Sequence, residues 1–157
     1  MKFSRKAIIT SIVIVSLILI FGLFKEDLWE VNEALLKKEV LSIDENIKHI
    51  NLQEVTPFEW DVMYSFAPYT SKDQIYDVVG YKWDKITETV SEGMNQIVFL
   101  KDGKVVCYLY GYPENNGYGI YFLGENFKGV ASKLSVKEDL DFQVTRSNGV
   151  IYLQANK

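Results

Sequence analysis

The stretch QIVFLKDGKVVCYLY, residues 96–110, predicts a β-hairpin. It reads as an apolar strand, Gln96–Leu100, a two-residue turn, Asp102-Gly103, and a returning strand, Lys104–Tyr110. Asp-Gly between two apolar runs is typical of a tight antiparallel hairpin. Both faces of the returning strand are apolar. We therefore expect helices to cover one face and a partner to contact the other.

Upstream of this hairpin, residues 58–66 alternate aromatic or apolar side chains with mostly polar ones, which predicts a half-buried strand. A short helix follows. Ser71 and Gln74 have the spacing of a capping box, and Gly80 is placed to end the helix in a left-handed conformation.

Downstream, the sequence predicts an antiparallel meander, and residues 124–140 are assigned no element. The Asn148-Gly149 dipeptide predicts a second hairpin. The strands expected here are Tyr118–Leu123, Phe142–Thr145 and Val150–Leu153. The predicted fold class is α+β: helices packed on one face of an antiparallel sheet of about five strands.

Residues 25–50 are predicted to form an amphipathic helical stalk. Their apolar side chains recur at helical spacing, and charged residues occupy the other faces. Ser42 and Asp44 are both able to cap a second helix, so a break near Ser42 is an alternative. The apolar stripe consists of Trp29, Leu36, Val40, Ile43, Ile47 and Ile50.

Residues 7–24 contain no charge, which predicts a transmembrane signal-anchor helix, with a cleaved signal peptide as the alternative. Lys2, Arg5 and Lys6 precede this span, so the positive-inside rule places residues 1–6 in the cytoplasm. The predicted organisation is a cytoplasmic tip (1–6), a single-pass anchor in the cell membrane (7–24), the stalk (25–50) and an extracytoplasmic α+β domain (51–157).

The charge of the chain is uneven. The 17 basic and 21 acidic residues give a net charge of -4, and three of the basic residues lie before residue 25. The remainder therefore holds 14 basic and 21 acidic side chains, a net charge of -7. Such a domain repels polyanions, so nucleic acid is excluded as a partner.

The sequence offers no catalytic, cofactor-binding or metal-binding set. Cys107 is the only cysteine and lies on a strand, where a small core residue is expected. His49 is the only histidine, which excludes a His-rich metal site and a catalytic triad of the usual kind. Glu59 and Asp61 form a carboxylate pair on one strand face, which leaves a weak hydrolase as an alternative.

Aromatic residues are the one chemical feature in excess. They make up 14% of the chain, and all ten tyrosines follow residue 60. Tyrosines on a rigid surface make good contacts with a protein or cell-wall partner, although strands also favour tyrosine for packing. The candidate partner-binding residues are Tyr108, Tyr110, Tyr112, Tyr118 and Tyr121.

One block of sequence resembles an uncharacterised family of small bacterial envelope proteins with a membrane or lipid anchor. The family shares a Trp-Asp-x-x-Tyr-x-Phe-x-Pro-Tyr-Thr block and a downstream Val-Phe-x-Lys-Asp-Gly hairpin. Here the block comprises Trp60, Asp61, Tyr64, Phe66, Pro68, Tyr69 and Thr70. The resemblance implies an envelope location and a structural role for the block, and it implies no activity. The chain lacks the anchor cysteine of the lipoprotein members.

Asp61 in that block carries a separate physical expectation. A carboxylate buried beside Trp60 needs a partner, because an unpaired buried charge is costly. Backbone N–H groups near Thr70 are the expected partners.

Together these observations predict a non-catalytic, extracytoplasmic, membrane-anchored protein that binds a partner or acts as an accessory module in a bacterial envelope. No cofactor is expected. The alternatives are an immunity or inhibitor protein, and a weak hydrolase that uses Glu59 and Asp61.

Overall fold

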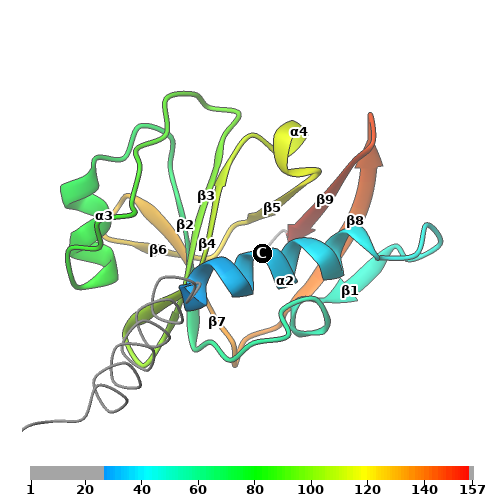
Figure 1. Cartoon of the computed structure of the whole chain (residues 1–157), viewed down its shortest axis with the longest axis horizontal. Helices are drawn as coiled ribbons and strands as arrows, with labels where there is room; N and C mark the ends of the chain where they lie inside the picture. The colour runs from blue at the N-terminus through cyan, green and yellow to red at the C-terminus, as the bar shows by residue number, and fades with distance from the viewer. Residues whose placement is uncertain (1–26, 156–157) are drawn as a thin grey trace, which may run out of the picture.

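The structure, a computed structural model, describes residues 27–155 (Figure 1). This part of the chain is mostly β, with a four-stranded sheet, a five-stranded sheet and a few helices. The elements are α2 (Leu28–Leu41), β1 (His49–Asn51), the single 3-10 turn η1 (Leu52–Glu54), β2 (Val62–Phe66), α3 (Lys72–Val79), β3 (Asn95–Lys101), β4 (Lys104–Gly111), α4 (Pro113–Asn116), β5 (Tyr118–Phe122), β6 (Glu125–Phe127), β7 (Ala131–Ser135), β8 (Asp141–Ser147) and β9 (Val150–Ala155).

The five-stranded sheet has the order β4-β3-β2-β7-β6 and is antiparallel throughout. Its β3–β4 hairpin turns at Asp102 and Gly103, with φ values of 48° and 71°. These left-handed conformations are those of the turn that the Asp-Gly pair favours, so the predicted hairpin is confirmed. A bulge beside Phe99 and Leu100 shifts the register, which leaves Val106 and Cys107 both on the inner side.

The four-stranded sheet has the order β1-β8-β9-β5. β8 and β9 form the second predicted hairpin, with Asn148 and Gly149 in left-handed conformations. β5 pairs with β9 in parallel. The side chain of Asn95, at the start of β3, bonds both backbone groups of Ile120 in β5: its Oδ1 accepts at 3.0 Å and its Nδ2 donates at 3.3 Å. An amide side chain thus ties the two sheets together.

The two faces of the five-stranded sheet contribute to separate apolar clusters. The inner face packs on the four-stranded sheet and on Leu36 and Val40 of α2. The outer face packs on α3 and on Ile86 in the loop that follows it. Alternate residues along each strand serve the two clusters, because side chains point to opposite faces at a period of two.

The outer edge of β4 is covered by side chains. The N–H of Val105 donates to the Tyr81 hydroxyl at 2.9 Å, and the carbonyl of Val106 accepts from Asn32 of α2 at 2.8 Å. The carbonyl of Tyr110 accepts from Asn116 at 3.2 Å. α2 packs against this edge through Asn32 and contacts both apolar clusters (Figure 1).

The predicted fold class, helices on one face of a single sheet of about five strands, is wrong. One physical reason is the connection after β4. Gly111 and Gly117 take φ values of 116° and 84°, and the short helix α4 between them redirects the chain into the second sheet. β5 therefore leaves the meander that local patterns predict.

Two further segments add strands that the prediction lacks. The predicted stalk helix ends at Leu41, where Ser42 forms the cap and Asp44 accepts from the N–H of Asn46 in a turn. The chain then forms β1, which pairs with β8. Residues 124–140, assigned no element, contain β6 and β7.

The predicted single-pass membrane topology also requires correction. Within residues 27–155, no helix is long and apolar enough to cross a bilayer. α2 has 14 residues, about 21 Å at 1.5 Å per residue, and carries charged side chains. The predicted cytoplasmic tip (1–6) and signal-anchor (7–24) lie outside the described residues. The transmembrane helix, the cell-membrane localisation and the extracytoplasmic placement of the domain are thus not supported.

The helix after β2 is predicted in detail and confirmed. Ser71 and Gln74 form a capping box at the start of α3, and Gly80 ends the helix at φ 94°. Each feature depends only on residues within one or two helical turns, which is why the sequence reveals it.

Candidate binding site

A groove lies on the outer face of the five-stranded sheet, between the start of α2 and the end of β4. Its volume is about 480 Å³. We call it the aromatic groove. Its lining residues come from α2, from the loop that precedes β3 and from β4: Trp29, Glu30, Glu33, Lys85, Thr87, Tyr108 and Tyr110.

Aromatic rings pack against one another around this groove. The rings of Trp29 and Trp83 meet edge to face with centroids 5.3 Å apart, and Trp83 meets Tyr108 in the same way at 5.4 Å. Tyr108 stacks on Tyr110 at 5.8 Å. Such pairs favour one arrangement of the rings, so the aromatic wall is pre-organised.

Hydrogen bonds fix the hydroxyl groups of Tyr108 and Tyr110. The Tyr108 hydroxyl accepts from Gln96 Nε2 at 3.0 Å and donates to the Thr87 carbonyl at 3.3 Å. The Tyr110 hydroxyl donates to the Glu88 carbonyl at 2.9 Å. Burial raises the pKa of Tyr108 to about 12, so this hydroxyl stays protonated at neutral pH.

Two polar atoms at the groove have no partner within residues 27–155. The indole Nε1 of Trp29 and the Oε1 of Gln96 are both buried and make no hydrogen bond. Gln96 is 1% exposed and is bonded to the two lining residues Thr87 and Tyr108. Unpaired buried polar groups are rare in folded proteins and cost free energy. Trp29 lines the groove, so its Nε1 is a candidate for contact with a ligand, whereas Gln96 is not among the lining residues.

The charges at the groove are mainly acidic. Glu30 and Glu33 line it from the first turns of α2, and Lys85 lines it from the opposite loop. Burial raises the pKa of Glu33, and the nearby charge of Lys37 partly opposes that shift. Two carboxylates therefore face a single lining cation.

The structure separates the five tyrosines that the sequence analysis singled out. Only Tyr108 and Tyr110 line the aromatic groove. Tyr118 is fully buried between the sheets, so its ring is not available to a partner. Tyr112 and Tyr121 are each 37% exposed, but Tyr112 lies against Gly93 and Tyr121 pairs with Tyr152 on the four-stranded sheet.

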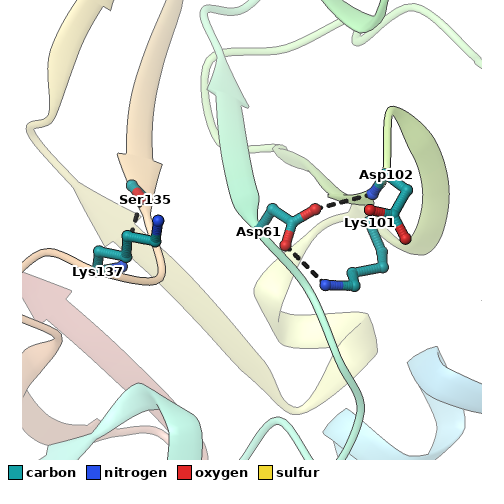
Figure 2. A network of polar contacts seen from close by, with 5 residues as sticks. All are labelled: Asp61, Lys101, Asp102, Ser135 and Lys137. Carbon is teal, nitrogen blue, oxygen red and sulfur yellow. Dashed lines mark hydrogen bonds and ion pairs between the residues drawn. The ribbon is translucent and has the colours of Figure 1, made fainter.

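Asp61, the residue before β2, lies in a polar cluster with Lys101 and Asp102 (Figure 2). Its carboxylate accepts from Lys101 Nζ at 2.9 Å and from the Asp102 N–H at 2.8 Å. The side chain of Asp61 is 48% exposed, so the expected burial beside Trp60 is not found, and its partners come from the β3–β4 turn and not from the loop near Thr70. The hydrogen bond from the backbone N–H of Asp102 lowers the pKa of Asp61 most, followed by the hydrogen bond from the Lys101 side chain, and the charges of Lys101 and Lys137 add to this.

This arrangement bears on the hydrolase alternative. Asp61 and Glu59 both line a shallow hollow with Lys101 and Trp60. A general acid needs a raised pKa and a free proton, whereas the pKa of Asp61 is lowered and its oxygens accept hydrogen bonds. The geometry therefore suits Asp61 as a structural anchor of the β3–β4 turn.

The other single residues have structural surroundings. Cys107 is fully buried in the inner cluster, as predicted, and burial raises the pKa of its thiol. His49 lies in β1, and not in a helix, where its Nδ1 contacts Asp141 at 2.9 Å. Within the described part of the chain, no three His, Cys, Asp or Glu side chains are placed to hold a metal ion.

The block that resembles an envelope family divides between the two faces of the larger sheet. Trp60 packs in the inner cluster and donates to Thr56 at 3.0 Å. Tyr64 and Phe66 pack in the outer cluster, and Thr70 is buried and donates to the Ala67 carbonyl. Pro68 is exposed, and Tyr69 is 62% exposed with φ 64°.

Comparison with family models, with curated proteins and with solved structures gives no match to this chain. The aromatic groove is therefore interpreted from its own residues. Sequence reasoning found Tyr108 and Tyr110 but missed Trp29, Trp83 and the two glutamates. Trp29 and Glu33 are four residues apart, a helical spacing that places them on neighbouring positions of one helix face.

Proposed function

We propose that this domain is a non-catalytic binding module and that the aromatic groove is its recognition site. The observation that carries the proposal is the convergence of Trp29, Tyr108 and Tyr110 on one accessible hollow of about 480 Å³. Tryptophan and tyrosine dominate the energetic centres of protein interfaces because they bury large area with little loss of side-chain freedom.

The fixed positions of the aromatic rings in the groove support this proposal. These rings are fixed by edge-to-face contacts and by hydrogen bonds from Gln96 and to Glu88. A site that is ordered before binding loses little conformational freedom when a partner arrives. The Trp29 indole N–H is buried and has no acceptor within residues 27–155, so a small shift of this ring on binding would add a hydrogen bond to the apolar contact.

The proposal that the module is non-catalytic draws on the Asp61 cluster. Its carboxylate, the strongest candidate for acid–base chemistry in the sequence, is bonded to Lys101 and Asp102. Immunity or inhibitor activity stays a prediction, and it would be one form of partner binding.

The test is a selection from a random peptide library displayed on phage. We expect peptides that bind the wild-type protein and bind the Tyr110→Ala variant at least about tenfold more weakly, because loss of a central interface aromatic costs on the order of 2 kcal/mol. Tyr121→Ala is the matched control, since Tyr121 has similar chemistry but lies on the other sheet.

Enriched peptides that tolerate Tyr110→Ala and lose binding with Tyr121→Ala would move the recognition site to the four-stranded sheet. Failure to enrich any peptide that depends on Tyr110 would contradict the proposed function. Circular dichroism of both variants establishes that each is folded.

A further inference from the structure

We propose that the aromatic groove binds an arginine side chain that is presented by a peptide segment of a partner protein. This inference rests on the proposed function, and it names the chemistry of the partner.

The first argument is the combination of rings and carboxylates in one hollow. Trp29 and Tyr110 supply partly exposed aromatic surface, Tyr108, which is 5% exposed, supplies only the edge of its ring, and Glu30 and Glu33 supply negative charge beside them. An aromatic face attracts a cation through its quadrupole, and a carboxylate binds a guanidinium through paired hydrogen bonds. A planar guanidinium satisfies both, because it stacks on rings and donates in the plane.

The second argument is charge complementarity beyond the groove. Residues 25–157 carry 14 basic and 21 acidic side chains, a net charge of -7. A field of this sign attracts basic segments and repels acidic ones. Lys85 lines the groove and opposes a cationic guest, and Lys37 lies near Glu33. The two lining carboxylates outnumber Lys85. Removal of Lys85 is therefore expected to tighten the binding of a cationic guest.

The third argument concerns the indole Nε1 of Trp29, a residue that lines the groove. Within residues 27–155 this atom is a donor without an acceptor. A guanidinium offers donors only, whereas a peptide backbone also offers carbonyl acceptors. A peptide that carries arginine therefore matches the groove better than a small cation.

The experiment uses the full chain and a defined probe, an acetylated and amidated Gly-Gly-Arg-Gly-Gly peptide. Binding is followed by the NMR signals of the tryptophan indole N–H groups. We expect the Trp29 signal to shift in a saturable manner. The Trp60 signal is the internal control, since its indole N–H is bonded to Thr56 in the inner cluster and is expected not to move.

The matched peptide replaces arginine with citrulline, which has nearly the same shape and no charge. We expect the arginine peptide to bind at least about fivefold more tightly, since cation–π and charge-assisted contacts are lost with the charge. Equal binding of the two peptides, or no shift of the Trp29 signal with either, would overturn the inference.

Protein variants supply an independent test. Lys85→Ala is expected to tighten binding of the arginine peptide, and the double variant Glu30→Gln, Glu33→Gln is expected to weaken it about fivefold. Lys104→Ala, at the other end of β4, is the control and is expected to have little effect. Weaker binding in Lys85→Ala would overturn the inference, because it would show that the groove prefers an acidic guest.

The phage selection separates this inference from the proposed function. If peptides that depend on Tyr110 are enriched and contain no arginine, the inference fails and the binding function stands. If no peptide depends on Tyr110, the binding function itself fails.

Discussion

The inner and outer faces of the five-stranded sheet are built from the same strands but differ in how completely they are closed. The inner face presents Met63, Phe99 and Leu109 to the other sheet, and each of these is at most 1% exposed. The outer face presents Tyr108 and Tyr110, and Trp29 packs beside them. Part of that outer layer is the aromatic groove.

This difference between the two faces indicates that the inner face contributes mainly to stability, whereas the outer face is able to contact a partner. Apolar side chains in a closed layer contribute through burial and packing alone. Aromatic side chains with polar tips can pack and still offer hydrogen bonds at an open surface. The four-stranded sheet and α2 together cover the inner face, whereas the outer face, covered by α3 and the 81–94 loop, also carries the aromatic groove.

The largest effect is expected from a cavity in the inner face. Phe99 is fully buried and packs edge to face on Phe58 and Trp60. Phe99→Ala should lower the free energy of unfolding by about 3–5 kcal/mol, measured by urea denaturation. Val90→Ala is the control, because Val90 is 71% exposed and its loss should change stability by less than about 0.5 kcal/mol. A loss below about 2 kcal/mol at Phe99 would contradict the view of a tightly closed inner face.

A smaller effect is expected from the polar network behind the groove. Tyr108→Phe removes the hydroxyl that bonds Gln96 and Thr87, and it should cost about 1–2 kcal/mol at neutral pH in the same denaturation assay. Tyr110→Phe loses one bond at a partly exposed site and should cost less. Equal losses in the free energy of unfolding for the two substitutions would contradict this prediction. They would show that the hydrogen bonds of Tyr108 contribute no more to stability than the single bond of Tyr110.

The stability that Tyr108 contributes to the outer face depends on pH. The pKa of Tyr108 rises from 10.0 to about 12 on folding, so the folded state holds the proton more tightly than the unfolded state does. Its contribution to stability is complete below pH 10 and is lost as the pH rises from about 10 to about 12. The wild-type protein should therefore lose more stability than Tyr108→Phe across this range.

The smallest effect is expected at the margin of the inner face, where Asp61 anchors the β3–β4 turn. Asp61→Asn should lower the thermal midpoint slightly at neutral pH, because it removes the ion pair with Lys101. The pKa of Asp61 is lowered on folding, so its contribution is present above the unfolded-state value of about 3.9 and is lost as the pH falls below it. The midpoints of wild type and variant should therefore converge in acid. In a double-mutant cycle with Lys101→Met, additive effects would show that the pair contributes nothing.

Local signals explain what the sequence predicts well. The Asp102-Gly103 and Asn148-Gly149 turns and the capped helix α3 each depend on neighbouring residues with special backbone requirements. The number of sheets depends instead on where β5 finds its partner, and β9 lies more than twenty residues away. No local pattern at β5 distinguishes β9 from β4 as its partner.

The candidate site was predicted only in part, because some of its residues come from distant parts of the chain. Tyr108 and Tyr110 are visible as an aromatic pair on one strand. Trp29 and Lys85 reach the same groove from distant parts of the chain, and their meeting depends on α2 packing against the β4 edge. Tyr118, similar to Tyr108 in the sequence, is buried because its strand joins the other sheet.

The side-chain contacts along β4 determine how a partner can approach the groove. Asn32, Tyr81 and Asn116 occupy backbone groups that an exposed edge strand would offer to another chain. Edge strands left open invite strand addition and aggregation. With these groups taken, a guest beside β4 cannot be recognised by extending the sheet at those positions. Selectivity here therefore depends mainly on the side chains of the guest and not on pairing of its backbone with β4.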